Sequence, residues 1–445
     1  MNILFVSLGC DKNLVDSEVM LNLLKKHGYN ITNDEQEADA AVVNTCCFIH
    51  DAKEESINTI LELAELKKTA RLQALIITGC LAQRYQKEIQ TEIPEVDAIL
   101  GSTNIDDIVS VVDEALHGRK VVCCKDIQYL PPHMTERTVT TGTAMAYLKI
   151  AEGCSKRCTY CIIPYLRGNY RSIPMEDILE TAERLAQEGY QELVLVAQET
   201  TVYGQDLYGE KRLPELLRRL CRLEGIQWIR LLYCYPEEIT EELIQTMAQE
   251  PKVCHYIDMP IQHSEDAILK AMGRRTNQKQ IREVVEQLRS AVPDIAIRTT
   301  LITGFPGETK EQHEALLDFV DEMEFERLGV FTYSPEEGTR AAQYPNQIEE
   351  AVKKQRQAEL MELQQEVSCD LNKNMIGACL RVLIEGYLYE ENVYLGRSYR
   401  EAPGVDGYIF VNSEEELVSG DMVSVKITDA NEYDLIGEVI YESAE

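Results

Sequence analysis

Short apolar runs alternate with longer amphipathic segments from residue 2 to about residue 335, and this alternation limits the possible folds more than any other feature of the 445-residue chain. It predicts α/β domains with parallel sheets. In the first third, the expected strands are Asn2–Leu8, Ala40–Thr45, Ala74–Gly79 and Ala98–Gly101. The six expected strands that follow are Ala146–Ala151, Glu192–Ala197, Trp228–Tyr233, His255–Met259, Ile295–Ile302 and Arg327–Tyr333.

The spacing of these runs indicates how the chain divides into domains. Residues 1–120 are expected to form an N-terminal parallel α/β domain, and the polar segment 121–145, which contains paired prolines, is expected to be a linker. Residues 146–372 hold six β/α units, too few to close an eight-stranded barrel. We therefore expect an open partial (β/α)6 barrel whose site lies at the carboxyl ends of its strands. Gln347–Asn374, without proline or glycine, is expected to be a plain connecting helix.

The last segment, residues 373–445, has a different character. Short strands separated by glycine, asparagine and aspartate predict a small all-β barrel of the OB type. This segment has five basic and fifteen acidic residues, and the whole chain has 44 basic and 76 acidic residues, for a net charge of −32. Because phosphate contacts supply most of the affinity for nucleic acids, this charge disfavours direct nucleic-acid binding and favours a basic protein partner.

The chain has no signal for a membrane or for export. No run of 18 apolar residues occurs, and the N-terminus lacks the basic region of a signal peptide. We expect a cytoplasmic protein with no membrane partner, in a compartment that keeps thiols reduced. Its 14 cysteines then favour metal or redox chemistry over disulfides.

Three cysteines within eight residues form the most specific motif, Cys154-x3-Cys158-x2-Cys161, directly after an expected strand. A structural zinc site normally has four ligands. Three thiolates would instead leave one iron of a four-iron cluster open to a substrate. An incomplete zinc site is the alternative interpretation.

A second set of three cysteines is scattered along the chain, but its members have equivalent positions relative to the expected strands. Cys10, Cys46 and Cys80 each follow an expected strand of the first domain. The carboxyl ends of parallel strands meet at one crevice, so these thiols can converge on a second cluster. Buried apolar cysteines are the alternative. The other eight cysteines show no ligand spacing, and we interpret them as packing residues.

These motifs together resemble the radical S-adenosylmethionine methylthiotransferases, which have an N-terminal cluster domain, a radical-SAM core and a TRAM domain. The resemblance covers nearly the whole chain and is greatest to the ribosomal protein S-12 methylthiotransferases. The matching runs are Leu8–Glu18, Asn44–Ile49, Leu148–Cys154 and Gly396–Ser398. The departures are Glu401 and Gly404, where we would expect aspartate and glutamate.

The resemblance implies two 4Fe-4S clusters and S-adenosylmethionine as cofactors. Cys154, Cys158 and Cys161 would be both catalytic and metal-binding, generating the radical that removes hydrogen from the β-carbon of an aspartate in S-12. The second cluster, on Cys10, Cys46 and Cys80, would deliver sulfur methylated by another S-adenosylmethionine. An electron donor such as flavodoxin or ferredoxin and a sulfur donor would be partners. The alternatives are a tRNA adenosine methylthiotransferase and a non-catalytic iron–sulfur or zinc scaffold.

Further cofactor contacts are expected around the second domain. Gly304, Gly307 and Glu308 form a loop after a strand, where backbone can approach a ligand closely. Glu199 stands in Ala197-Gln198-Glu199, where many related enzymes have Gly-Gly-Glu. Arg171, also expected to bind the cofactor, and Arg167 could pair with a cofactor or substrate carboxylate or form an exposed salt bridge. Asp258 and His263, at the end of the fourth strand, are expected to face the same site, with a structural role as the alternative for His263.

Overall fold

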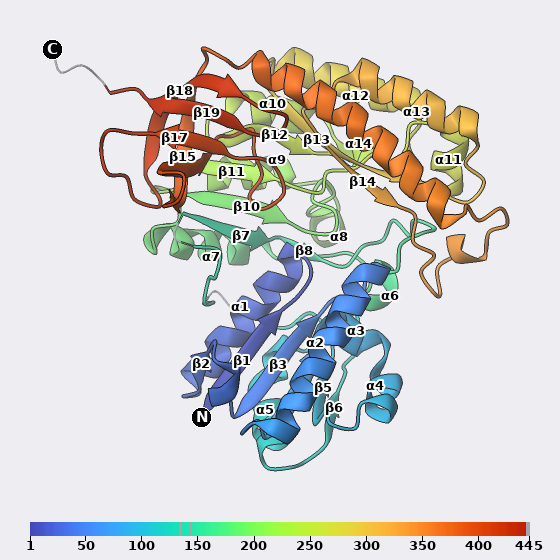
Figure 1. Ribbon diagram of the computed structural model, residues 1–445, viewed down its shortest axis with the longest axis vertical. Helices are drawn as coiled ribbons and strands as arrows, with labels where there is room; N and C mark the ends of the chain where they lie inside the picture. Colours follow the sequence, from blue (N-terminus) through green and yellow to red (C-terminus); the bar gives the residue numbers. More distant parts are fainter. Residues whose placement is uncertain (133–135, 143, 442–445) are drawn as a thin grey trace.

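The computed structural model describes residues 1–132, 136–142 and 144–441. The chain forms two parallel sheets and a closed barrel, with the N-terminal sheet below the larger domain in Figure 1. This arrangement confirms the expected fold class. The predicted linker 121–145 includes residues 133–135 and 143, and the predicted barrel domain 373–445 includes residues 442–445; these lie outside the described residues.

The first sheet has six parallel strands in the order β2-β1-β3-β4-β5-β6. Its strands are β1 (Asn2–Ser7), β2 (Asn30–Thr32), β3 (Ala40–Thr45), β4 (Ala74–Thr78), β5 (Ala98–Leu100) and β6 (Val121–Cys123). Its helices are α1 (Asp11–Lys26), α2 (His50–Thr69), α3 (Gly79–Arg84), α4 (Gln86–Glu92) and α5 (Ile108–Leu116). β3 and β4 are buried throughout because helices cover both faces, which is why residues 40–43 and 74–77 are uninterrupted apolar runs.

The second sheet is an open, all-parallel array in the order β7-β10-β11-β12-β13-β14. Its strands are β7 (Met145–Lys149), β10 (Glu192–Val196), β11 (Trp228–Leu231), β12 (Val253–Asp258), β13 (Ala296–Thr303) and β14 (Arg327–Thr332). The helices of this domain are α6 (Ile163–Leu166), α7 (Met175–Gln187), α8 (Gln205–Tyr208), α9 (Leu213–Leu220), α10 (Glu241–Gln249), α11 (Asp266–Ala271), α12 (Gln278–Ala291) and α13 (Lys310–Met323). A separate antiparallel ribbon pairs β8 (Ala151–Glu152) with β9 (Arg171–Ser172).

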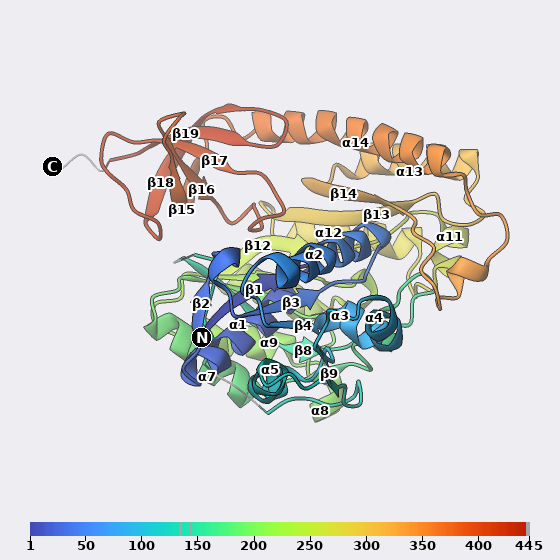
Figure 2. The same cartoon turned by 60° about the horizontal axis from the view of Figure 1, so that its bottom comes forward.

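The closed barrel follows a long helix, α14 (Glu350–Lys373), which Figure 2 shows reaching across the molecule. α14 is more than a connection, because Leu360 is fully buried in the main core of the second domain. The barrel order is β15-β16-β17-β19-β18. Its strands are β15 (Cys379–Leu388), β16 (Val393–Arg397), β17 (Ile409–Asn412), β18 (Met422–Ala430) and β19 (Leu435–Val439).

A buried charge cluster joins this barrel to the second sheet. Glu192 of β10 lies 2.6 Å from Arg230 Nε of β11 and 2.7 Å from Arg397 Nη2 of β16. All three side chains are fully buried. Glu192 is the first residue of β10, so this part of the barrel is attached away from the carboxyl end of that strand.

Ion pairs also join the N-terminal domain to the second domain. Lys53 and Arg84 both contact Glu336, at 2.8 Å and 3.2 Å. On α1, Asp16 pairs with Lys149 of β7 and with Arg167, the latter at 2.7 Å. The two α/β domains are thereby held with the carboxyl ends of the first sheet toward β8 (Figure 1).

Among the described residues, no helix is long and apolar enough to cross a membrane.

Candidate metal centre

Cys10, Cys46 and Cys80 lie directly beyond three parallel strands of the first sheet. Cys10 caps the start of α1, Cys46 follows β3, and Cys80 lies in the first turn of α3 after β4. The loops that carry Cys10 and Cys46 lie close together at Gly9. The φ of Gly9 is +89°, and a Cβ there would lie 3.0 Å from the Sγ of Cys46. Only glycine fits this conformation and this space.

The thiols of this first trio affect one another. Burial raises the pKa of the Cys46 thiol to about 12, and the thiols of Cys80 and Cys10 add to the effect. Burial also raises the pKa of Cys80, but Arg167 opposes the rise, since its Nε lies 3.4 Å from the Cys80 Sγ. The three thiols are therefore near enough to influence one another electrostatically. Iron ligation would require all three to be deprotonated.

The second trio occupies the loop that follows β8. Cys154 and Cys158 are each 6% exposed. Burial raises the pKa of Cys154 to about 11, and the side chains of Glu199 and Cys158 contribute to the rise. A Cβ at Gly153 would lie 2.2 Å from the carbonyl oxygen of Asn169, so this loop also depends on a glycine.

No group of three or more His, Cys, Asp or Glu side chains within the described part of the chain is arranged to hold a single metal ion. A four-iron cluster makes a different demand, because each of its thiolate ligands binds a separate iron.

Buried polar atoms without partners surround the second trio. Gln198 Oε1 is a buried acceptor with no hydrogen bond, and Arg274 Nε and Nη1 are buried donors with none. Arg274 reaches this region because the Thr159 N–H donates to Met272 O at 2.8 Å, and its guanidinium lies 4.1 Å from the Tyr235 ring centroid. Unpaired acceptors and donors that separate segments bring to the same loop fit a zwitterionic amino-acid group, such as that of S-adenosylmethionine.

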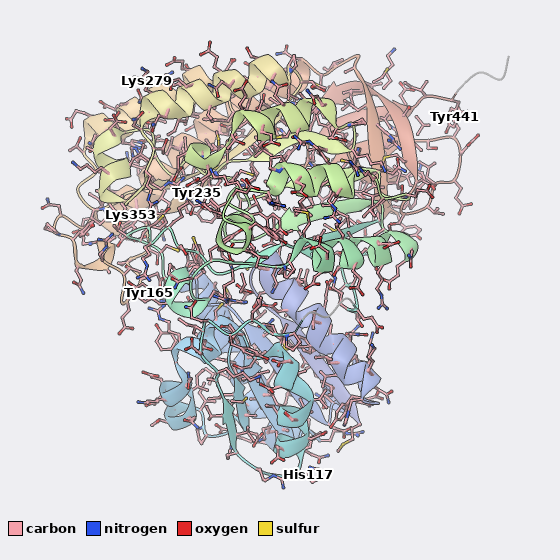
Figure 3. All side chains as sticks on the ribbon, turned by 180° about the vertical axis from the view of Figure 1, so that it is seen from behind. His117, Tyr165, Tyr235, Lys279, Lys353 and Tyr441 are labelled. Atoms are coloured by element: carbon pink, nitrogen blue, oxygen red, sulfur yellow. The ribbon has the colours of Figure 1, made fainter. Side chains whose placement is uncertain are left out.

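Glu199 lies at the carboxyl end of β10, near this loop. Its Oε2 is 3.3 Å from Lys156 Nζ, and the side chain is 1% exposed. Burial raises the pKa of Glu199 to about 7, although Lys156 opposes the rise. In Figure 3, Tyr235 lies within the second domain and Tyr165 lies near its border with the first.

Arg167 and Arg171 contact protein groups. Arg171 Nη1 donates to the Asn169 carbonyl at 2.6 Å, and its Nη2 donates to the Arg167 carbonyl at 3.0 Å. Arg167 is 2% exposed and binds groups of the first domain. The exposed salt bridge considered for this pair is therefore wrong for Arg167.

The glycine loop after β13 is held from within by Glu308. Its Oε2 accepts hydrogen bonds from the N–H groups of Gly304 at 2.6 Å and Phe305 at 3.0 Å, and its Oε1 lies 2.9 Å from Arg356 Nη1. A Cβ at Gly304 would lie 2.4 Å from Lys353 Cγ of α14. Gly307 has a φ of +86° with open space beside it. Glu308 therefore shapes the loop.

The residues expected at the end of β12 have different surroundings. Asp258 accepts a hydrogen bond from the Tyr233 N–H at 3.0 Å and pairs with Arg298 at 2.9 Å. His263 is fully buried, and burial lowers its pKa to about 3, so the ring is neutral.

A contact across the two domains was not expected from the sequence. Lys12 lies 3.2 Å from the Tyr233 ring centroid, and the Tyr233 hydroxyl donates to Asp11 Oδ1 at 3.1 Å. Tyr233 has a φ of +60°, which no local sequence pattern indicates. The contact places α1, next to Cys10, against the end of β11.

Three family models match the chain in order. "Uncharacterized protein family UPF0004" matches residues 2–101, "Radical SAM superfamily" matches residues 148–320, and "TRAM domain" matches residues 376–440.

Curated relatives are similar over almost the entire chain. Ribosomal protein uS12 methylthiotransferase RimO of Lachnoclostridium phytofermentans is 60% identical over 437 residues, which cover 98% of this chain and 99% of the relative. The protein of the same name from Clostridioides difficile is 51% identical over 438 residues, 98% of each chain. That of Geobacter sulfurreducens is 50% identical over 437 residues, again 98% of each chain.

Two solved structures share the fold at low sequence identity. The radical S-adenosylmethionine methyltransferase TsrM from Kitasatospora setae, with cobalamin and a [4Fe-4S] cluster bound, has a TM-score of 0.52 and is 13% identical, covering 85% of this chain and 80% of that one. The cobalamin-dependent S-adenosylmethionine radical enzyme OxsB has a TM-score of 0.52 and is 12% identical, covering 81% of this chain and 56% of that one.

Proposed function

This chain belongs to the family of ribosomal protein uS12 methylthiotransferases, and from that premise we propose that it is the radical S-adenosylmethionine enzyme that inserts a methylthio group at the β-carbon of an aspartate of uS12. The observation that carries the assignment is the 60% identity to a uS12 methylthiotransferase over 98% of the chain. The acidic chain also suits a basic ribosomal protein better than tRNA.

The domains divide the work in this proposal. Residues 1–120 hold one 4Fe-4S cluster on Cys10, Cys46 and Cys80, which provides the sulfur. Residues 146–372 hold the other on Cys154, Cys158 and Cys161. Residues 121–145 connect them, and residues 373–445 form the TRAM barrel. Support for a second cluster comes from three thiols that converge although about 35 residues separate consecutive members in sequence.

When bound, the open-iron cluster and S-adenosylmethionine would supply the radical that removes hydrogen from the substrate carbon. The chain's part is to bind and orient. Glu199 and Gln198 offer acceptors to the ammonium group of the cofactor, and the free N–H groups of Arg274 offer donors to its carboxylate. Arg171 has a buried Nε without a partner and remains a candidate for the same region.

In this proposal, the glycine loop after β13 shapes the part of the site that holds the nucleoside. Gly304 and Gly307 let the backbone approach the nucleoside part of the cofactor, and Glu308 fixes the loop through its two backbone contacts. An electron donor such as flavodoxin or ferredoxin and a sulfur donor complete the reaction.

The test compares a strain lacking this protein with its parent. Intact-mass spectrometry of uS12 should show one methylthio group in the parent and none in the deletion strain, while tRNA nucleosides should be unchanged. Loss of a methylthio mark from tRNA with uS12 unaltered would instead identify a tRNA adenosine methylthiotransferase. If both marks remained, a scaffold role would replace the enzymatic one.

A further inference from the structure

Arg167 belongs to the second α/β domain but binds into the first. It follows Cys161 by six residues, and the residue is 2% exposed. Its Nε lies 3.4 Å from the Cys80 Sγ, its Nη2 donates to Asn13 Oδ1 at 2.8 Å, and its Nη1 lies 2.7 Å from Asp16 Oδ2. One side chain thus holds a proposed cluster ligand and the start of α1.

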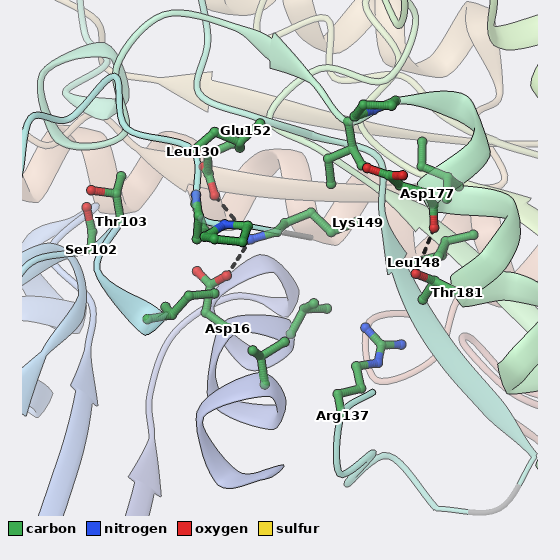
Figure 4. Close-up of a pocket in the computed structure, with 18 residues that line it drawn as sticks. Asp16, Ser102, Thr103, Leu130, Arg137, Leu148, Lys149, Glu152, Asp177 and Thr181 are labelled. Carbon is green, nitrogen blue, oxygen red and sulfur yellow. Dashed lines mark hydrogen bonds and ion pairs between the residues drawn. The ribbon is translucent and has the colours of Figure 1, made fainter. Parts of the chain in front are cut away.

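The same guanidinium also reaches back to its own domain. Nη1 lies 3.2 Å from Glu152 Oε2, and Glu152 directly precedes the loop of the second cysteine trio. Lys149 pairs with the same two carboxylates, Asp16 and Glu152. Figure 4 shows Asp16, Lys149 and Glu152 at the wall of a cavity of 130 Å³ between the domains. Lys149 and Arg167 therefore neutralise the same two carboxylates. Of these two cations, it is Arg167 that contacts the Cys80 thiol.

A hydrogen bond to a ligand sulfur changes the properties of an iron–sulfur cluster. Reduction adds negative charge to the cluster and its thiolates, and an N–H donor that carries positive charge stabilises that charge. Removal of the donor should make reduction harder and lower the potential. Arginine keeps its charge at every accessible pH, so the contact persists in both oxidation states.

We propose that Arg167 is a positioning residue for the cluster on Cys10, Cys46 and Cys80. Its Nε–H donates to the Cys80 thiolate and raises the reduction potential of that cluster, while its other N–H groups hold the first domain against the loop of the second trio. The inference rests on the proposed function, because it requires a cluster on these three cysteines.

The test uses the full chain with Cys154, Cys158 and Cys161 replaced by alanine, so that only the first cluster can assemble. After anaerobic reconstitution, the midpoint potential is measured by a redox titration followed by EPR. Arg167→Gln in this background should lower the potential. Lys149→Gln removes one positive charge from the same two carboxylates but leaves the sulfur contact, so its potential should stay close to that of the background protein. Equal potentials in all three proteins, or equal shifts in both variants, would overturn the proposal.

A second measurement does not depend on how the Arg167 variant folds. In the background protein labelled with ¹⁵N-arginine, pulsed EPR of the reduced cluster should show coupling to an arginine nitrogen. Absence of this coupling would overturn the role of Arg167 and leave the proposed function intact. Absence of any iron–sulfur cluster from the background protein would contradict the proposed two-cluster function itself.

Discussion

Cys46 and Cys154 occupy comparable places in the two α/β domains, since each lies in a loop that follows a strand. Their proposed tasks are different, and single substitutions can separate them. Cys154→Ala should abolish cleavage of S-adenosylmethionine, because the open-iron cluster loses a ligand. Cys46→Ala should keep cleavage and lose methylthio transfer. The measurements are 5′-deoxyadenosine by chromatography and modified uS12 by mass spectrometry.

Cys47 provides the control for this pair. It is fully buried next to Cys46 but shows no ligand spacing, so Cys47→Ala should retain both activities. Methylthiolated uS12 produced by the Cys46 variant would refute the division of labour between the trios.

Arg274 supports a prediction about cofactor binding. Its two unpaired buried donors are expected to meet the carboxylate of S-adenosylmethionine. A charge-assisted hydrogen bond contributes about 1.5–3 kcal/mol, so Arg274→Gln should weaken binding roughly tenfold to a hundredfold. Equilibrium binding to the reconstituted protein measures this. Arg275→Gln, which alters the exposed neighbour, should leave the affinity unchanged, and equal affinities for both variants would exclude Arg274 as the contact.

At this scale, the sequence could predict residues that stand in a local pattern and could not predict those assembled by tertiary contacts. The spacing of Cys154, Cys158 and Cys161 is visible in one loop. Arg274 lies more than a hundred residues away and reaches the loop through the contact between Thr159 and Met272. Nothing in the sequence near Arg167 indicates that its side chain points into another domain.

At the scale of elements, the strands that were predicted correctly are those whose buried residues produce an apolar pattern in the sequence. β3 and β10 are buried along their whole length, and residues 40–43 and 193–196 within them are uninterrupted apolar runs. β2 and β6 were missed because they have three residues each and none of them is buried, whereas β5, equally short, is buried along its length and was predicted. β6 pairs with β5, so the first sheet extends into the segment predicted as a linker.

The junction of β10, β11 and β16 predicts how stability depends on pH. Burial alone would raise the pKa of Glu192, but Arg230 and Arg397 outweigh burial and hold the pKa below its ordinary value of 4.5. A carboxyl group with a lowered pKa in the folded state stabilises the fold above its unfolded pKa, and this contribution is lost as the pH falls. The free energy of unfolding of the apoprotein should therefore decrease as the pH falls below about 4.5.

Glu192→Gln should reduce that dependence on pH. At pH 7 it should lower the free energy of unfolding by about 3 kcal/mol, because two buried guanidinium groups lose their carboxylate. Denaturation by urea, followed by circular dichroism between pH 7 and about pH 3, measures both effects. Glu183→Gln, at an exposed position of α7, is the control. A variant of Glu192 as stable as the control would contradict the assigned role of this junction.

At the scale of the whole molecule, the net charge of −32 predicts how the protein meets its substrate. Attraction between an acidic enzyme and a basic protein is screened by salt, with a Debye length of about 10 Å at 0.1 M ionic strength. The rate of uS12 modification at low uS12 concentration should fall several-fold as the ionic strength rises from about 0.05 M to about 0.3 M. Cleavage of S-adenosylmethionine without uS12 should change little over the same range and serves as the control. A rate of modification that does not depend on salt would show that net charge does not contribute to recognition of uS12.

The order of the domains could be predicted from the sequence, but their relative placement could not. Glu336 binds Lys53 and Arg84, and Asp16 binds Arg167, over separations of 151 to 283 residues. Such ion pairs join residues far apart in the chain, so they leave no periodic pattern in the sequence. They bring the carboxyl end of the first sheet to the cysteine loop of the second domain.

The central claim is that two trios of cysteines each hold a four-iron cluster. Iron and acid-labile sulfide per chain, determined after anaerobic reconstitution, test it most directly. The full chain should hold about eight irons with a similar amount of sulfide, and a variant with either trio replaced by alanine should hold about four. About four irons in the unaltered chain, or zinc without labile sulfide, would contradict the account.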